Sequence, residues 1–287
     1  MTARIYGAFR WLRAHPAAAW TILFVYAAVV TFPHEQVQTV VGEMAKAMGR
    51  KNLYRMAGAV GLALGAWATA VFMPQLRRQK LRALIGGYFI ASFALIFGAW
   101  GFLTANNTEL VHYPQYFVPG ALLMALTLSP LESLSWILIT GGLDECFQYW
   151  YLHGTWAVPY DFNDVFMDFA GGALGVMFAM AFLRVEKRHG APFSIKPATA
   201  VLAAIVASGL ILFASGKLLL YKNDALPYWI ALSRLRMPGF WFFDETWGPK
   251  VFHTLTPVEG PILLLAALAF FAVLDAKLKI SPPDERP

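Results

Sequence analysis

Residues Ala198 to Tyr221 have the sequence ATAVLAAIVASGLILFASGKLLLY, which contains a single charged residue, Lys217. A helix needs about 20 mostly apolar residues to cross the hydrocarbon core of a bilayer. We therefore expect this stretch to cross a membrane as a helix. Comparable stretches are Ala17 to Pro33, Met56 to Leu76, Ala83 to Leu103, Val111 to Leu128, Leu131 to Leu152, Phe162 to Leu183 and Pro257 to Leu274.

The composition of the whole chain agrees with a membrane protein. Of the 287 residues, 58% are hydrophobic and 14% are charged, whereas soluble domains contain roughly 25% charged residues. We predict an all-α fold, a polytopic helical bundle of about eight transmembrane helices. No linker-like segment or internal repeat divides the chain, so residues 1–287 are expected to form a single membrane domain. The first and last stretches are barely long enough to cross a bilayer, which leaves six or seven spans as alternatives.

The distribution of positive charge predicts the orientation of the bundle. Short loops rich in Lys and Arg stay on the cytoplasmic side of a membrane. The densest such group lies between the second and third stretches and consists of Arg77, Arg78, Lys80 and Arg82. With eight spans, both termini are then cytoplasmic as well. Apolar side chains between residues 37 and 48 recur at helical spacing and predict an amphipathic helix on the outer surface.

Several classes of function are excluded by composition. The chain has one cysteine, Cys146, so it forms no internal disulfide and no cluster of thiolates for a metal. The formal net charge of +6 arises from Lys and Arg placed between apolar stretches, and no nucleic-acid partner is expected. Only His112 lies within a predicted span, so no haem is expected either.

Polar residues gather where three predicted spans begin or end. They are His112 and Tyr116 in the fourth span, Asp144, Glu145 and Gln148 in the fifth, and Asp161, Asp164 and Asp168 in the sixth. The three span-six aspartates are spaced by three and four residues, which places them on one helix face. Acidic residues inside a membrane usually face the interior of a bundle or a wet cavity. We therefore expect these residues to converge on one site in the outer half of the membrane.

The residue types at this site suit acid–base chemistry. Glu145 or Asp168 is the predicted general acid or base, and His112 the proton shuttle or a ligand partner. The remaining polar residues of the cluster, expected to bind the ligand, are Asp144, Gln148, Asp161, Asp164 and Tyr116. A divalent cation among the carboxylates is left open, and its identity is unknown. Gly171 and Gly175 form a G-x-x-x-G pair that allows two helices to approach closely.

The same residues resemble the VanZ-like family of bacterial membrane proteins. The resemblance rests on DECFQ at 144–148, on DFNDVFMDFAGGALG at 161–175 and on VHYPQY at 111–116, and it covers about residues 109–183. It places the family's polar and glycine positions on Glu145, Gln148, Asp164, Asp168, Gly171 and Gly175. It implies a multi-pass protein of the bacterial cytoplasmic (inner) membrane. The founding member of the family is linked to low-level glycopeptide resistance, but the biochemical activity of the family is unsettled.

The chain departs from the family pattern in ways that remove positive charge. Asp168 stands where the family usually has Asn, and Val158 and Pro159 stand near the position of a common Arg. Thr108 and Glu109 replace a usual Asp-Lys pair. The site is therefore expected to be more negative than in the family.

The leading functional hypothesis is that the site binds or modifies a lipid-linked or cell-wall-related substrate. One alternative is an accessory or structural subunit that docks a partner membrane protein, and another is a proton- or cation-coupled transporter. A third is that the polar residues only join helices through hydrogen bonds. Membrane lipids are expected partners in every case, and the sequence leaves open whether the protein is an enzyme.

Overall fold

The structure is a computed structural model, and it describes residues 2–154, 158–188, 195–227, 230–235, 241–242 and 251–282. The all-α prediction is confirmed for these residues. The α-helices are α1 Thr2–Ala14, α2 Pro16–Thr31, α3 His34–Met48, α4 Arg50–Leu76, α5 Arg82–Phe102, α6 His112–Thr127, α7 Pro130–Cys146, α8 Phe162–Met180, α9 Pro197–Ala214 and α10 Glu259–Lys277. A 3₁₀ helix, Asn107–Val111, precedes α6, and a π-helix, Phe147–Leu152, continues α7.

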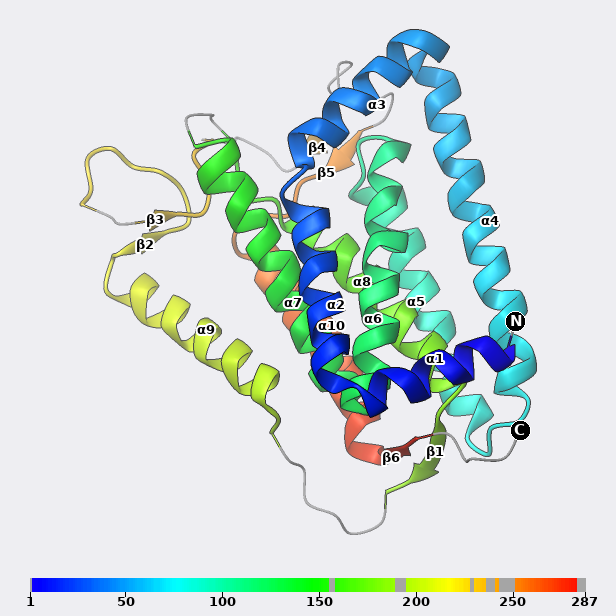
Figure 1. Ribbon diagram of the computed structural model, residues 1–287. Coiled ribbons are helices and arrows are strands. Elements are labelled where there is room, and N and C mark those ends of the chain that lie inside the picture. The colour runs from blue at the N-terminus through cyan, green and yellow to red at the C-terminus, as the bar shows by residue number, and fades with distance from the viewer. Residues whose placement is uncertain are drawn as a thin grey trace.

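Helix α8 is the centre of the bundle. Every residue from Val165 to Met180 is buried, and α5, α6, α7 and α10 pack around it (Figure 1). A helix that is apolar on all sides is stable only where other helices or lipid cover it completely. The sequence of α8, which is polar only near its beginning, therefore explains both its central place and the position of the site at one end.

Glycines let α6 and α8 approach until their backbones touch. A Cβ atom added to Gly175 would overlap the carbonyl oxygen of Phe117, and one added to Gly171 would lie 2.5 Å from the carbonyl oxygen of Tyr113. In the opposite direction, a Cβ atom on Gly120 would overlap the carbonyl oxygen of Gly172. The predicted G-x-x-x-G pair thus lies in the closest helix contact, where only glycine fits.

The described helices include four that are long and apolar enough to cross a membrane, namely α4, α5, α9 and α10. Helices α1 and α2 together form a further apolar pair, but they are bent by 106° at their junction. Helices α2, α6, α7 and α8 lie over other predicted stretches. Helix α3 covers the segment predicted to be amphipathic, contains no buried residue and lies across one end of the bundle (Figure 1).

Helix α9 leans away from the bundle (Figure 1) and is held at its first turn. The buried Glu132 of α7 accepts hydrogen bonds from the backbone N–H groups of Ala198 and Thr199, at 2.8 and 3.1 Å, and from the Thr199 hydroxyl at 3.1 Å. A carboxylate is favourable at the N-terminus of a helix because it satisfies unpaired N–H groups. Of the residues of α9, only Ala198 is buried.

The described residues include six short strands that were not predicted from the sequence. They are β1 Arg184–Lys187, β2 Leu218–Leu219, β3 Ile230–Ala231, β4 Trp241–Phe242, β5 Phe252–His253 and β6 Leu278–Ser281. Strands β1 and β6 form an antiparallel ribbon in which Arg184 is opposite Ser281. Strands β2 and β3 pair in parallel, and β4 and β5 pair antiparallel.

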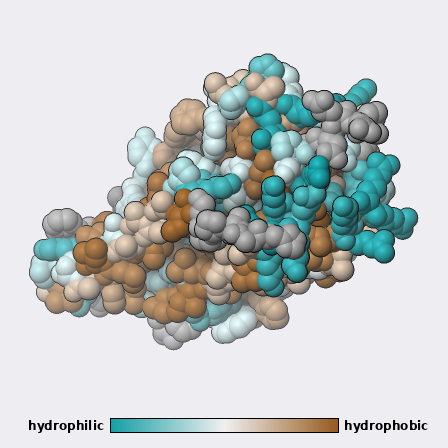
Figure 2. Space-filling view, turned by 90° about the horizontal axis from the view of Figure 1, so that it is seen from below, coloured by the Kyte–Doolittle hydropathy of each residue, from teal (hydrophilic) through white to brown (hydrophobic). Residues whose placement is uncertain are grey.

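Basic residues lie at both ends of the bundle. Around the junction of α3 and α4, the exposed basic residues are Lys46, Arg50, Lys51 and Arg55. The exposed residues Arg77, Arg78, Lys80 and Arg82 lie at the α4–α5 connection, at the lower end in Figure 1. Seen from that end, hydrophilic residues gather on one side of the molecule and hydrophobic residues on the other (Figure 2). The predicted site residues lie at the opposite end, where α6 and α8 begin.

Candidate functional site

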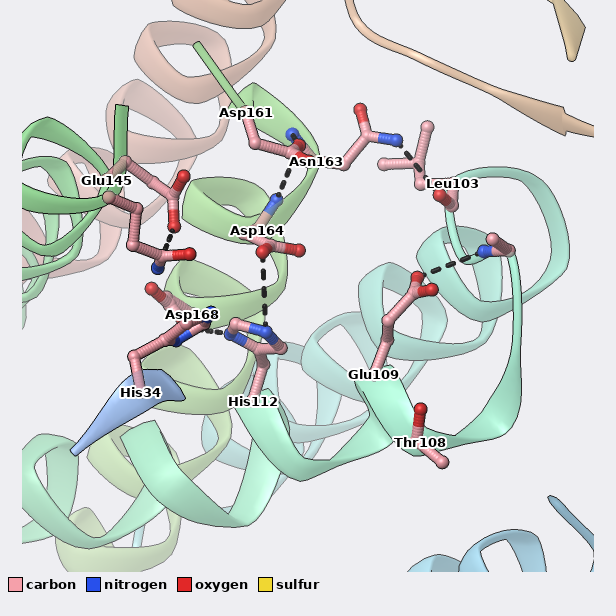
Figure 3. Close-up of polar contacts among 12 residues, drawn as sticks. His34, Leu103, Thr108, Glu109, His112, Glu145, Asp161, Asn163, Asp164 and Asp168 are labelled. Atoms are coloured by element: carbon pink, nitrogen blue, oxygen red, sulfur yellow. Dashed lines mark hydrogen bonds and ion pairs between the residues drawn. The ribbon is translucent and has the colours of Figure 1, made fainter. Parts of the chain in front are cut away.

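The site forms where α6, α7 and α8 meet, and its centre is His112. This residue begins α6 and points towards two carboxylates of α8 (Figure 3). Its Nδ1 atom lies 2.8 Å from Asp168 Oδ1, and its Nε2 atom lies 3.5 Å from Asp164 Oδ2. Because Asp164 and Asp168 are one helical turn apart, both reach the same imidazole. The structure therefore brings His112 together with two of the three aspartates predicted for the site, Asp164 and Asp168.

The two carboxylates differ in their access to the surface. The Asp168 side chain has 0% exposure, whereas Asp164 has 18% and His112 has 11%. Asp168 therefore fixes the imidazole from inside the bundle. The Nε2 atom, on the side of Asp164, is the ring nitrogen nearer the outside. Tyr116, one turn after His112, is buried and also interacts with Asp168.

Helix α7 contributes a hydrogen-bonded pair, Glu145 and Gln148. Gln148 Nε2 donates to Glu145 Oε1 at 2.8 Å, and both side chains are buried. The π-helix that starts at Phe147 carries Gln148, and π-helical turns often occur at functional sites. The sequence spacing places Gln148 four residues after Asp144 and three after Glu145, on neighbouring stripes of one helix, and in the structure Gln148 bonds to Glu145.

Asp144 completes the cluster from the same helix. It is buried, and its electrostatic neighbours are His112, His34 and Asp164, with Thr31 nearby. His34, the first residue of α3, thus approaches the site from the outer surface (Figure 3). Within the described part of the chain, two buried carboxylate oxygens, Asp144 Oδ1 and Asp168 Oδ2, have no partner within hydrogen-bond geometry, although the Thr31 and Tyr116 side chains lie close to these two carboxylates. Buried polar atoms are nearly always paired, so these two oxygens need an explanation.

Asp161 has a structural role in addition to its charge. Its Oδ1 atom accepts hydrogen bonds from the backbone N–H groups of Asn163 at 2.9 Å and Asp164 at 3.3 Å. Asp161 is therefore the N-cap of α8, which is a common role for an aspartate at this position. This bond fixes the first turn of the helix that carries Asp164.

Asn163 and Tyr160 were not singled out from the sequence. Asn163 Nδ2 donates to the carbonyl oxygens of Leu103 at 2.9 Å and His253 at 2.7 Å, and its Oδ1 atom accepts from the N–H of Leu255 at 2.8 Å. Tyr160 donates through its hydroxyl to the carbonyl oxygen of Gly142 at 2.8 Å. Both residues join the beginning of α8 to other segments. The signal that the sequence contained was an asparagine two residues after Asp161, at the start of a predicted span.

Glu259, His253 and His153 are further polar residues that lie outside the cluster. Glu259 bonds to His253 at 3.1 Å at the beginning of α10. The backbone carbonyl of His153 accepts a hydrogen bond from Arg234 at 2.7 Å. In the part of the chain that the structure describes, no group of three or more His, Cys, Asp or Glu residues is arranged to hold a metal ion.

Glu109, just before α6, gives the site a pH-dependent element outside the predicted spans. Its carboxylate accepts hydrogen bonds from the N–H groups of Ala105 at 3.0 Å and Asn106 at 3.3 Å. The pKa of Glu109 is raised to about 8, mainly because the side chain is buried and next because Asp164 repels its negative charge. A carboxyl group with a raised pKa in the folded state stabilises the fold at low pH. This stabilisation is lost as the pH rises from near 4.5 towards 8.

We therefore expect the unfolding midpoint of the detergent-purified protein to fall between pH 5 and pH 8.5, and to fall less in Glu109→Gln. The amide of Gln cannot ionise, so the variant lacks this contribution to the pH dependence. Thermal unfolding at the two pH values would measure the difference. An identical pH dependence in both proteins would show that Glu109 titrates like an exposed carboxylate.

Comparisons with known proteins identified no relative of this chain. No protein-family model, no curated protein and no solved structure matches the chain. Its function is therefore inferred from the site itself.

Proposed function

We propose that the protein crosses the membrane with eight helices and that its acidic site acts on a lipid-linked or cell-wall-related substrate in the outer leaflet. The observation that supports this most directly is the position of His112 between Asp164 and Asp168. A histidine that is fixed through one nitrogen by a buried carboxylate can exchange a proton through the other nitrogen. We assign the proton transfer to His112 Nε2, and Asp168 is a positioning residue.

Glu145 is a second candidate for proton transfer in this proposal. Its neighbours Asp144, Asp161, Asp164 and Asp168 are all acidic, so a proton or a cationic group is favoured near it. Gln148 donates a hydrogen bond to Glu145 Oε1. Together with His112, the site would then offer one histidine and one carboxyl group for acid–base chemistry.

The packing below the site favours action on one side of the membrane over transport through it. From Phe169 to Met180, α8 carries no polar side chain and is buried throughout. Gly171 and Gly175 bring this segment into backbone contact with α6. A proton or solute that moved from the site to the other end would have to pass this closely packed segment. We therefore place a transporter second among the candidate functions.

The proposed orientation follows from charge. The Arg77 to Arg82 connection lies at the end opposite the site (Figure 1), and positive loops favour the cytoplasmic side. The site then faces the outer leaflet. The VanZ-like resemblance of residues 109–183 supports a place in the bacterial cell envelope.

The proposal is tested by expressing the protein in a bacterial host and measuring lipid-linked cell-wall precursors by mass spectrometry. We expect the unsubstituted protein to change the amount or the structure of one precursor. His112→Gln should reduce that change by about 100-fold or more, since general acid–base catalysis contributes factors of about 10² to 10⁴. The matched control is His15→Gln, because His15 is exposed between α1 and α2. An unchanged precursor profile, or equal effects of both substitutions at equal membrane levels, would refute the proposal.

A further inference from the structure

Helix α3 has an apolar side that the described part of the chain leaves largely exposed. Val37 and Val40 are 53% and 59% exposed, and they share one side of the helix with Met44 and Met48. None of the residues of α3 is buried, and the helix lies across the end of the bundle at which α6 and α8 begin (Figure 1). An amphipathic helix in this position suits the boundary between the headgroups and the acyl chains of a bilayer.

Helix α4, which follows α3, is longer than the hydrocarbon core of a membrane. Its apolar part, residues 56–76, is about 31 Å long at 1.5 Å per residue, which matches a core of about 30 Å. Residues 50–55 extend the helix beyond this part by about 9 Å. The headgroup layer on each side of the core is roughly 5 to 8 Å thick. The beginning of α4 therefore lies among the headgroups of the leaflet at this end.

Basic side chains occupy this beginning of α4. Lys51 and Arg55 are exposed and lie one helical turn apart on one side of the helix, and the sequence of α4 contains no acidic residue. Two turns beyond Arg55, the same side carries Leu62, which is 57% exposed. Lys46, near the end of α3, already pairs with Glu43 at 2.7 Å. Lys51 and Arg55 thus lie at headgroup level, next to an apolar surface that faces lipid.

We propose that the α3–α4 junction binds an anionic phospholipid, with the phosphate between Lys51 and Arg55 and an acyl chain along α4 towards Leu62. A guanidinium group donates two hydrogen bonds to one phosphate, and an ammonium group adds a second positive charge. A zwitterionic lipid has no net charge, so these two residues attract it less strongly. Lipid binding at this junction is independent of the reaction at His112.

A bound anionic lipid also accounts for basic residues at this end of the bundle. Lys and Arg are typically more abundant at the cytoplasmic ends of membrane helices, and the Arg77 to Arg82 connection lies at the opposite end (Figure 1). A phosphate between Lys51 and Arg55 would offset the charge that these residues place in the other leaflet. The basic residues of the α3–α4 junction then have a ligand in the membrane itself.

The test uses the full-length protein in nanodiscs of phosphatidylcholine with a small fraction of a lipid whose headgroup is photoreactive. This lipid is a phosphatidylglycerol in one preparation and a phosphatidylcholine with the same acyl chains in the other. Mass spectrometry of the digested protein measures the lipid attached to residues 46–56. We expect at least about ten-fold more attachment of phosphatidylglycerol, because each basic residue near a charged surface contributes about five-fold. Equal attachment of the two lipids would overturn the proposal.

Substitutions then locate the phosphate. The double variant Lys51→Gln and Arg55→Gln should lower the attachment of phosphatidylglycerol to residues 46–56 about ten-fold or more. The matched control is Arg77→Gln with Lys80→Gln, which removes two exposed charges near the other end of α4 and should leave this attachment unchanged. An equal loss in both variants would mean that attachment follows the net charge of the protein. That result, or no loss in the first variant, contradicts the proposal.

Inorganic phosphate separates a lipid site from a site for a soluble anion. Sodium phosphate and sodium chloride at equal ionic strength should lower the attachment equally, because they screen charge to the same extent. A larger effect of phosphate would assign the junction to a soluble phosphate-bearing ligand and refute the lipid site. The comparison of the two lipids on the unsubstituted protein decides the question where a variant does not fold.

Discussion

Gly175→Ala is expected to destabilise the protein by about 3 kcal/mol or more, or to prevent its folding. The added methyl group would overlap the Phe117 carbonyl oxygen and lie 2.9 Å from the Ala121 amide nitrogen. These are backbone atoms of α6, which cannot rotate away as a side chain does, so the two helices would have to separate. Overpacking of a close contact costs typically 1–3 kcal/mol, and occasionally more. The free energy of unfolding, measured by denaturant titration of the purified protein in mixed micelles, would reveal the loss.

The matched control is Gly87→Ala in α5. Gly87 is also a helical glycine, but a Cβ atom added there meets nothing within 4 Å. Alanine favours a helix over glycine by up to about 1 kcal/mol, so this variant should be as stable as the unsubstituted protein or slightly more stable. A similar loss of stability in both variants would show that α6 and α8 do not pack in this way.

Asp168→Asn is expected to lower the effect on lipid-linked precursors by about 10² to 10⁴-fold while the protein still folds. Asparagine has nearly the shape of aspartate, and its side-chain oxygen can still accept from His112 Nδ1. It carries no charge, however, and therefore cannot stabilise the protonated imidazole that forms during proton transfer. The measurement is the rate of precursor change in membranes with equal amounts of each protein, recorded over a range of pH. Loss or displacement of the pH optimum would indicate that the substitution has changed the protonation of His112.

Asp275→Asn provides the comparison for a purely structural loss. Asp275 is also buried and accepts a hydrogen bond from the Ser129 hydroxyl at 2.6 Å. It belongs to the last turn of α10, at the other end of the bundle from the site. This variant should keep the rate and the pH profile. If it lowers the rate as much as Asp168→Asn does, the loss reflects weakened packing instead of proton transfer.

The helices over the eight apolar stretches could be predicted because each stretch encodes its helix locally, and the helical spacing of apolar residues predicted α3; α1, which is not an apolar stretch, was not predicted. The α8 segment, for example, was placed at residues 162–183, and the helix covers Phe162–Met180. The β1–β6 ribbon could not be predicted, since Arg184 pairs with Ser281, a residue far along the chain. Such pairing depends on where α8 and α10 end in space. The bend between α1 and α2 likewise depends on the packing of α1 against the bundle.

The site could be predicted in part for the same reason. The four-residue spacing of Asp164 and Asp168 is a local property of the sequence. It placed both carboxylates on one face of the predicted helix, although it did not show which residue they contact. The spacing of Gln148 allowed both Asp144 and Glu145 as partners, and the sequence did not decide between them; in the structure the π-helix that carries Gln148 directs it to Glu145. Asn163 donates hydrogen bonds to the carbonyl oxygens of Leu103 and His253, which are far from it in the sequence. These bonds depend on the three-dimensional packing and could not be predicted from local sequence.

The attachment of α9 at one end has a consequence for the response of the protein to bilayer thickness. With 18 residues, the helix is about 27 Å long, slightly shorter than a typical hydrocarbon core of about 30 Å. A helix packed along its whole length would transmit that mismatch to its neighbours. Because Ala198 is its single buried residue, we expect α9 to change its tilt as the lipid composition changes, between the Glu132 bonds at its first turn and the β2–β3 pair that follows its end. Helices α6, α7 and α8 then keep their relative positions, and so does His112.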